Sequence, residues 1–148
     1  MPGAEVESSP FVLDASVAVR WIVPEEGSEE AATLLQRPIR WFAPRLILTE
    51  TASALRRKVV GGQLRAEQAP EALDIIMGAV ADGTIRLAAE EAFMPAALML
   101  ALSLQHKLPD CVYLALAEHA GAGLATADRR LSALAQGRGV PTVLVPSA

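Results

Sequence analysis

Residues 108–128 read LPDCVYLALAEHAGAGLATAD and combine the two patterns from which the architecture of this chain follows. The first part, Pro109 to His119, is almost wholly apolar over the length of a helix, which predicts a buried helix. The second part contains Leu124-Ala125-Thr126, a short run that predicts a strand. A buried helix therefore comes directly before a strand, and the same alternation continues along the rest of the chain.

Strands separated by helices are predicted throughout the sequence. The expected strands are 11–13, 39–42, 84–87, 124–126 and 142–145, and the expected helices are 15–22, 28–36, 44–60, 66–81, 91–106, 109–119 and 129–136. Ser28 is expected to cap the second helix, and Pro44 to lie in the first turn of the third. Because a parallel connection needs a crossover of helix length, this order predicts an α/β fold, a three-layer α/β/α sandwich with a central parallel sheet of four to five strands.

The composition limits the class of protein. The 148 residues fit one domain, expected at 10–148 behind a flexible N-terminal segment at 1–9. The apolar stretch from Phe93 to Leu104 contains Pro95 and is too short to span a bilayer, so we expect a cytoplasmic protein with no membrane contact. One cysteine and two histidines supply too few ligands for a thiolate or histidine zinc site. With a net charge of −4, binding of nucleic acid would need a local basic patch or bound cations.

Three acidic side chains are expected where a parallel sheet binds its ligands, beyond the carboxyl ends of the strands, and a fourth, Glu50, is singled out by its surroundings on its own helix. Asp14 ends the first predicted strand, and Asp128 follows the fourth by two residues. Asp110 lies in the first turn of the buried helix. Glu50 has no basic residue three or four positions away on its helix, so if buried its carboxylate needs a tertiary partner or a metal ion.

Each of these acids also has a purely structural explanation. Asp14 and Asp128 could cap the helices that follow them, and Asp110 could interact with the dipole of its own helix. Glu50 could pair with a distant arginine such as Arg20 or Arg129. Residues placed independently as caps would have no reason to converge, however, and converging carboxylates repel one another unless a cation lies between them. Hard oxygen ligands suit Mg²⁺ or Mn²⁺, so the pattern predicts an acidic pocket that binds a divalent cation.

Four segments resemble a single family over nearly the whole chain. They are VLDASVAVRWIVPEE at 12–26, APRLILTETASALRR at 43–57, LPDCVYLALAEHAGAGLATADRRL at 108–131 and PTVLV at 141–145. In this order and spacing they resemble a PIN-domain ribonuclease, and within that group the VapC toxins of bacterial type II toxin–antitoxin pairs. The most specific part is DCVYLALA followed by LATAD.

The resemblance implies hydrolysis of RNA phosphodiester bonds with Mg²⁺ or Mn²⁺ as cofactor. The positions that match the catalytic and metal-binding acids of the family are Asp14, Glu50, Asp110 and Asp128. Ser16 and Thr126 match positions where the family often has a hydroxyl group near the metal. The alternative explanation for these two is a hydroxyl at a helix start and a turn residue at a strand end.

An RNA substrate would need positive charge near this pocket. Arg56, Arg57 and Lys58 form a compact basic run on the third predicted helix, and Arg20 and Arg129 lie close in sequence to other site segments. We interpret these side chains as candidate RNA phosphate contacts. The alternative is an exposed helix face whose charge favours the C-terminal end of the helix.

The resemblance also implies two protein partners. These are a second copy of the chain in a homodimer and a cognate antitoxin that lays a peptide across the early helices. Aromatic residues are enriched in the cores of interfaces. We therefore interpret Trp21 as a candidate interface residue, whereas Phe42 is expected to pack in the core.

Three other functions compete with the toxin. A phosphoacceptor receiver domain would need a lysine after its last strand, but the only lysines are Lys58 and Lys107. A non-catalytic RNA-binding module of the same fold would be expected to lack one or more of the acids. A PIN-type nuclease in RNA processing outside toxin–antitoxin systems would retain them, and only the compactness of the chain favours the toxin over it.

Overall fold

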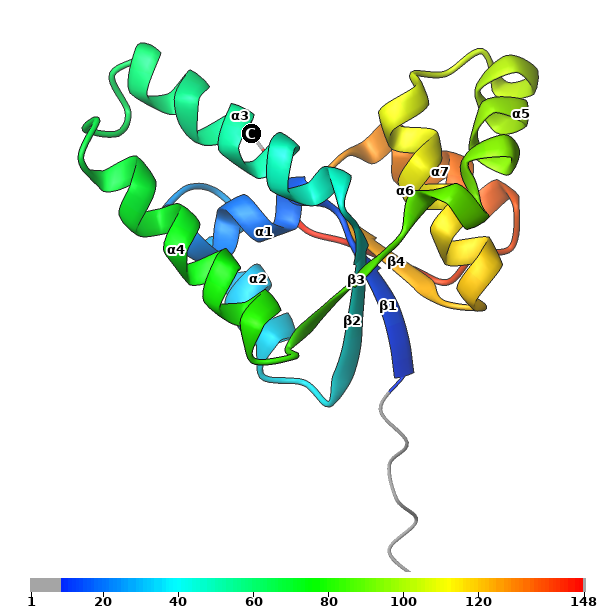
Figure 1. Ribbon diagram of the computed structural model, residues 1–148, viewed down its shortest axis with the longest axis horizontal. Coiled ribbons are helices and arrows are strands. Elements are labelled where there is room, and N and C mark those ends of the chain that lie inside the picture. Colours follow the sequence, from blue (N-terminus) through cyan, green and yellow to red (C-terminus); the bar gives the residue numbers. More distant parts are fainter. Residues whose placement is uncertain (1–8, 148) are drawn as a thin grey trace, which may run out of the picture.

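The computed structural model describes residues 9–147, in which one or more helices separate each strand from the next (Figure 1). The strands are β1 (Ser9–Leu13), β2 (Ile39–Pro44), β3 (Ile85–Ala88), β4 (Gly123–Thr126) and β5 (Thr142–Leu144). The helices are α1 (Ala15–Ile22), α2 (Ser28–Leu35), α3 (Leu46–Val60), α4 (Gln68–Ala81), the short 3₁₀ helix η1 (Glu90–Ala92), α5 (Met94–Leu104), α6 (Leu108–Ala120) and α7 (Arg129–Gly137). Of the segment predicted to be flexible, residues 1–8 lie outside the described residues, and Ser9 is already part of β1.

The five strands form one sheet in the order β3-β2-β1-β4-β5, and all of its pairings are parallel. This confirms the predicted parallel sheet. Strand β1 lies at the centre of the sheet. The chain adds β2 and then β3 on one side of β1, and afterwards β4 and β5 on the other side. Leu13 pairs with Ala125, so the residues that follow β1 and β4 emerge side by side at one edge. Such a change of direction in strand order is where open α/β sheets bind ligands.

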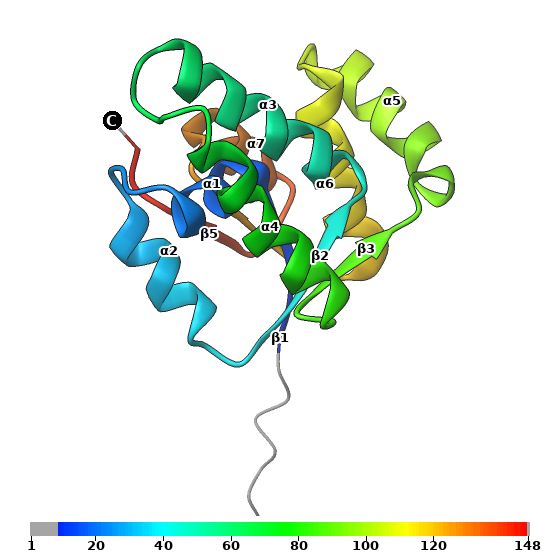
Figure 2. The same ribbon diagram turned by 60° about the vertical axis from the view of Figure 1, so that its left-hand side comes forward.

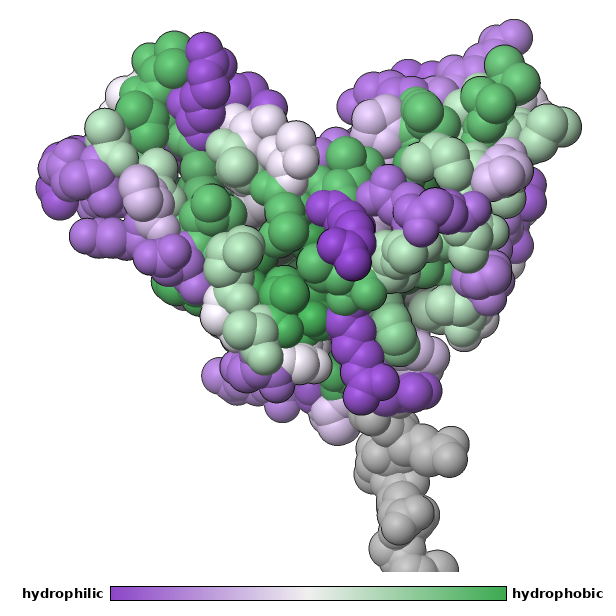
Figure 3. Space-filling view, viewed as in Figure 1, coloured by the Kyte–Doolittle hydropathy of each residue, from purple (hydrophilic) through white to green (hydrophobic). Residues whose placement is uncertain are grey.

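Helices cover both faces of the sheet, which confirms the three-layer sandwich (Figure 2). Helices α1 to α4 contact one another on one face, while α6 contacts the central strands and α5 on the other, and α7 contacts β4 and β5. Every residue of α6 from Asp110 to Ala117 is buried, as its apolar sequence predicts. Between the helices of the two sides the molecular surface is notched (Figure 3).

Two predicted helix starts are wrong in detail. Ser28 does not cap α2. Its hydroxyl instead accepts from the amide of Glu25 and donates to the carbonyl of Val23, and Gly27, in the left-handed region at φ 90°, takes the cap position. Pro44 ends β2 rather than opening α3.

The predicted helix over 91–106 is divided into η1 and α5. Phe93 breaks the helical conformation between them and buries its ring, with 2% of its surface exposed. Glu90 in η1 accepts a hydrogen bond from the Leu46 amide at 2.7 Å and so satisfies a free N–H group at the start of α3. Local sequence could not predict this cap, because its donor and acceptor lie far apart in the chain.

Trp21, interpreted from the sequence as a candidate interface residue, packs within the chain, and so does Phe42. Trp21 donates from its indole nitrogen to the carbonyl of Ala31 at 2.6 Å, and its ring meets Trp41 edge-on with the centroids 5.6 Å apart. It therefore anchors α1 against α2 and β2. Phe42 packs against the main core, as expected. No helix within the described residues is both long enough and apolar enough to cross a membrane.

Candidate active site

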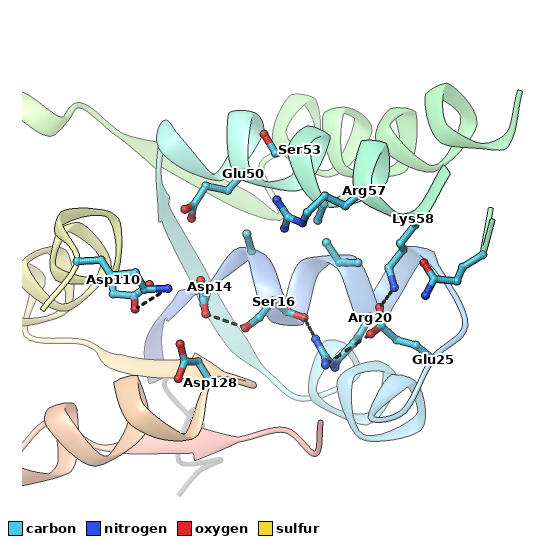
Figure 4. Close-up of a pocket in the computed structure, with 15 residues that line it drawn as sticks. Asp14, Ser16, Arg20, Glu25, Glu50, Ser53, Arg57, Lys58, Asp110 and Asp128 are labelled. Atoms are coloured by element: carbon cyan, nitrogen blue, oxygen red, sulfur yellow. Dashed lines mark hydrogen bonds and ion pairs between the residues drawn. The ribbon is translucent and has the colours of Figure 1, made fainter. Parts of the chain in front are cut away.

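All four predicted acids line a single pocket of about 600 Å³ at the carboxyl edge of the sheet. Asp14 follows β1, Asp128 follows β4, Glu50 comes from α3 and Asp110 from the start of α6 (Figure 4). The strand-end rule places the first two, because β1 and β4 are neighbours. Helices α3 and α6 then bring their acids in from opposite sides.

Asp14 is buried and is held by two hydroxyl groups. Its Oδ2 accepts hydrogen bonds from Ser16 and from Thr126, both at 2.7 Å. Burial raises the pKa of the Asp14 carboxyl above its usual value, and the nearby negative charges of Asp110 and Asp128 raise it further, against the lowering effect of the two hydroxyls. Ser16 and Thr126 thus orient an aspartate whose charge the protein itself does not fully compensate.

Asp128 is the N-cap of α7, which confirms the alternative explanation that this residue caps the helix after it. Its Oδ1 accepts from the backbone amides of Arg130 at 2.9 Å and Leu131 at 3.2 Å. Its own amide donates to the Thr126 hydroxyl at 3.0 Å, which ties it to the group that holds Asp14. Capping uses only one oxygen of this carboxylate, so a second role remains open to it.

Asp110 has partners that the sequence did not suggest. Its Oδ2 lies 2.6 Å from Nε2 of His106 and 3.7 Å from Nζ of Lys107. Both partners precede α6, which begins at Leu108, so the usual helical spacing rules do not apply to them. The sequence did carry one signal, since one of only two histidines lies four positions before a candidate ligand.

The three aspartates share an arrangement. In each, the hydrogen bonds made with other described residues go to a single oxygen: Oδ2 of Asp14 and Asp110, and Oδ1 of Asp128. The protein thereby fixes the orientation of each carboxylate and leaves its other oxygen without a hydrogen bond from the described part of the chain. Carboxylates oriented in this way are suited to binding a cation.

Glu50 differs because it forms no ion pair with any of residues 9–147, and the polar group beside its carboxylate is the buried hydroxyl of Tyr113. Arg20 is not its partner, since that guanidinium binds elsewhere. Burial raises the pKa of Glu50, and the charges of Asp14 and Asp110 add to the shift. The interaction with the buried hydroxyl of Tyr113 acts the other way and lowers the pKa of Glu50, but by less than burial raises it.

The opposite end of the pocket is basic but partly self-neutralised (Figure 4). Glu25 pairs with Lys58 at 2.9 Å and with Arg20 at 3.5 Å. Arg20 also donates to the carbonyl groups of Ser16 and Glu26. Two of the candidate phosphate contacts are therefore already engaged in holding the fold.

The remaining basic candidates divide between different surfaces. Arg57 lines the pocket and forms no ion pair within the described residues. Arg56, its neighbour in sequence, instead lines a separate shallow hollow on α3. Arg129 is exposed at the start of α7 and is not part of the pocket lining.

The donor set fits a hard divalent cation by its chemistry, although it is not a closed cage. All four acids offer oxygen ligands, which Mg²⁺ and Mn²⁺ prefer. Burial is the main cause of the raised pKa values of Asp14 and Glu50, and the repulsion between the acids, which adds to it, is what a cation would relieve. Within residues 9–147, no three acidic, histidine or cysteine side chains lie close enough together to form a ready-made metal site. Binding would therefore require these side chains to draw together.

Comparison with known proteins identifies the family. The sequence model of the PIN domain matches residues 11–137, and the chain therefore belongs to the PIN domain family, whose members are nucleases. No curated protein matches the sequence.

Solved structures share this fold at low sequence identity. PAE2754 from Pyrobaculum aerophilum is 20% identical with a TM-score of 0.68, covering 91% of this chain and 90% of that one. VapC20 from Mycobacterium tuberculosis, described as a toxin that cleaves the sarcin–ricin loop, is 16% identical with a TM-score of 0.67, covering 84% and 94%. VapBC2 from Rickettsia felis, solved with a DNA fragment from its promoter, is 14% identical with a TM-score of 0.64, covering 92% and 98%. At these identities the likeness establishes the fold alone.

Proposed function

We propose that this protein is a metal-dependent ribonuclease that acts as the toxin of a toxin–antitoxin pair. The observation that carries the proposal is the pocket in which Asp14, Glu50, Asp110 and Asp128 meet, in a chain of the PIN domain family. A purely structural explanation of the acids accounts for the capping by Asp128 but not for the convergence of all four. The toxins among the proteins of the same fold support the biological role.

The proposed roles follow from how each acid is held. Asp14, Asp110 and Asp128 would hold Mg²⁺ or Mn²⁺ through the oxygens that their protein partners leave free. When bound, such an ion would supply Lewis acidity at the scissile phosphate and make water a better nucleophile. Glu50 has no ion-pair partner among the described residues and a raised pKa, so its carboxylate can accept a proton from the attacking water or contribute to a second ion.

The direct test is cleavage of labelled single-stranded RNA by the purified chain. Cleavage is expected with Mn²⁺ or Mg²⁺ and is expected to stop when EDTA removes the ion. Single-stranded DNA of the same sequence serves as the comparison for substrate class. Undiminished cleavage in EDTA, or no cleavage of any RNA with either ion, would contradict the proposal.

Arg57 is the proposed phosphate contact at the basic end of the pocket. Arg57→Gln is expected to weaken RNA binding and to reduce the slope of log affinity against log salt by about 0.7, the value for one contact to a single strand. Arg56→Gln is the matched control, because it removes the same charge from a side chain outside the pocket. Filter binding across a salt series measures both slopes, and equal changes in the two variants would mean that only overall charge matters.

The proposed protein partners are a cognate antitoxin and a second copy of the chain. An apolar strip on α5 offers surface for the latter, since Leu98, Met99 and Leu102 are 51%, 66% and 66% exposed. Light scattering would measure the oligomeric state.

Expression of the chain alone is expected to arrest bacterial growth, with relief when the neighbouring reading frame is co-expressed. Intact RNA cleavage without growth arrest would favour a PIN nuclease of RNA processing.

A further inference from the structure

His106 is a buried histidine in the turn between α5 and α6, and the chemistry proposed above does not use it. Only 2% of its side-chain surface is exposed. Its Nε2 lies 2.6 Å from Oδ2 of Asp110, whose side chain is 12% exposed. A buried imidazole in close contact with a proposed metal ligand calls for an explanation, because such polar groups are costly to bury unless they are paired.

The backbone of the turn fixes the position of this imidazole. Helix α5 ends at Leu104, and Gln105 adopts the left-handed conformation at φ 50°, the only residue other than glycine with positive φ in the described chain. The amides of Gln105 and His106 both donate to the carbonyl of Ala101. The chain therefore turns sharply and places His106 beneath the first turn of α6.

The contact fixes which oxygen of Asp110 faces the protein. Acting as a metal ligand, Asp110 would be ionised and could only accept hydrogen bonds, so Nε2 of His106 would be the donor. Lys107 approaches the same oxygen at 3.7 Å, but its side chain is 70% exposed, so solvent screens this ion pair. The buried bond to His106 is thus the main constraint on the carboxylate, and it leaves Oδ1 unengaged by the described residues.

We propose that His106 is a positioning residue that holds Asp110 by Oδ2 and so presents Oδ1 to the divalent cation. It would do for Asp110 what the hydroxyls of Ser16 and Thr126 do for Asp14. The inference rests on the proposed function, since it assumes that the pocket binds a cation. Residues that orient a metal ligand in this way typically contribute a factor of about 10–100 to metal affinity.

The test is the affinity of the folded protein for Mn²⁺, measured by isothermal titration calorimetry without RNA. His106→Leu removes the donor but keeps an apolar side chain of similar bulk, and it is expected to weaken Mn²⁺ binding about 10–100-fold. His106→Gln is expected to recover most of the affinity, because its amide nitrogen lies near the position of Nε2. His119→Leu is the matched control, since His119 is exposed on α6 outside the pocket and its loss should leave the affinity unchanged.

The outcomes separate this inference from the proposed function. If the wild-type protein binds no Mn²⁺ and cleaves no RNA, both fail together. If the wild type binds Mn²⁺ and His106→Leu binds it equally well, even with a lower melting temperature, His106 is merely structural and only the inference is overturned. Should His106→Leu not fold, His106→Asn takes its place, because that amide is too short to replace Nε2 and should show the same loss relative to His106→Gln.

Discussion

Asp14→Asn is expected to lower the rate of RNA cleavage by about 1,000-fold, since a catalytic metal ion supplies several kcal/mol of transition-state stabilisation that would be lost with its ligand. The substitution keeps the size of the side chain and an oxygen that can accept from Ser16 and Thr126, so the fold should remain intact. Single-turnover cleavage of a labelled RNA at saturating Mn²⁺ measures the loss.

Asp74→Asn is the matched control for that experiment. Asp74 lies on the exposed side of α4 and is not among the residues that line the pocket. Its substitution removes the same charge from the chain and should leave the cleavage rate unchanged. A wild-type rate in Asp14→Asn, in a protein confirmed to be folded and supplied with metal, would refute the catalytic assignment.

The second large effect concerns stability rather than rate. Mn²⁺ at about 100 times its dissociation constant is expected to stabilise the wild-type protein by about 2.7 kcal/mol, or about 5–10 °C in melting temperature. Asp14→Asn should lose this response while being more stable than the wild type in EDTA. The reason is that burial and neighbouring charges raise the pKa of Asp14, so its ionised form is a cost to the metal-free fold.

The pH dependence of the metal-free protein follows from the same shift. A folded-state pKa above the unfolded value means that the folded chain binds the proton more tightly. Below the ordinary carboxyl pKa Asp14 is protonated in both states and imposes no cost. The tighter proton binding of the folded chain stabilises it at low pH, and this stabilisation is lost as the pH rises through the raised folded pKa of Asp14. Thermal melts of wild type and Asp14→Asn in EDTA should therefore diverge with rising pH, and parallel curves would contradict the prediction.

The sequence was sufficient to predict the sheet and the position of its acids because both depend on simple geometry. Alternating strands and helices require parallel pairing, and residues after parallel strands emerge at one edge. Asp14 and Asp128 are the clearest instance, since their strands turned out to be neighbours. Burial of α6 was likewise predictable, because its apolar residues leave it no polar face.

The basic run on α3 shows what helical geometry could have added. Glu50, Ser53, Ala54, Arg57 and Lys58 all line the pocket, at the spacing of three and four residues that defines one helix face. Arg56 lies one position before Arg57, does not fit this spacing, and lines the separate hollow on another face of α3. Grouping Arg56 with Arg57 and Lys58 in one patch ignored the turn of about 100° between successive helical residues.

Contacts made across loops were beyond prediction from the sequence. The bond between His106 and Asp110 depends on the left-handed conformation of Gln105, for which the sequence gives no glycine signal. The pairing of Glu25 with Arg20 and Lys58 depends on how α3 packs beside α1. Such contacts follow from tertiary packing, which local patterns do not encode.

The pairing of β1 with β4 has a consequence for the chain while it is being synthesised. The hydroxyl of Thr126 that holds Asp14 lies 112 positions further along the chain. A growing polypeptide on the ribosome therefore has no complete pocket until residues beyond Asp128 have emerged and β4 has taken its place beside β1. Under the proposed function, a translation product that stops before β4 would lack both Thr126 and Asp128 and would therefore not cleave RNA.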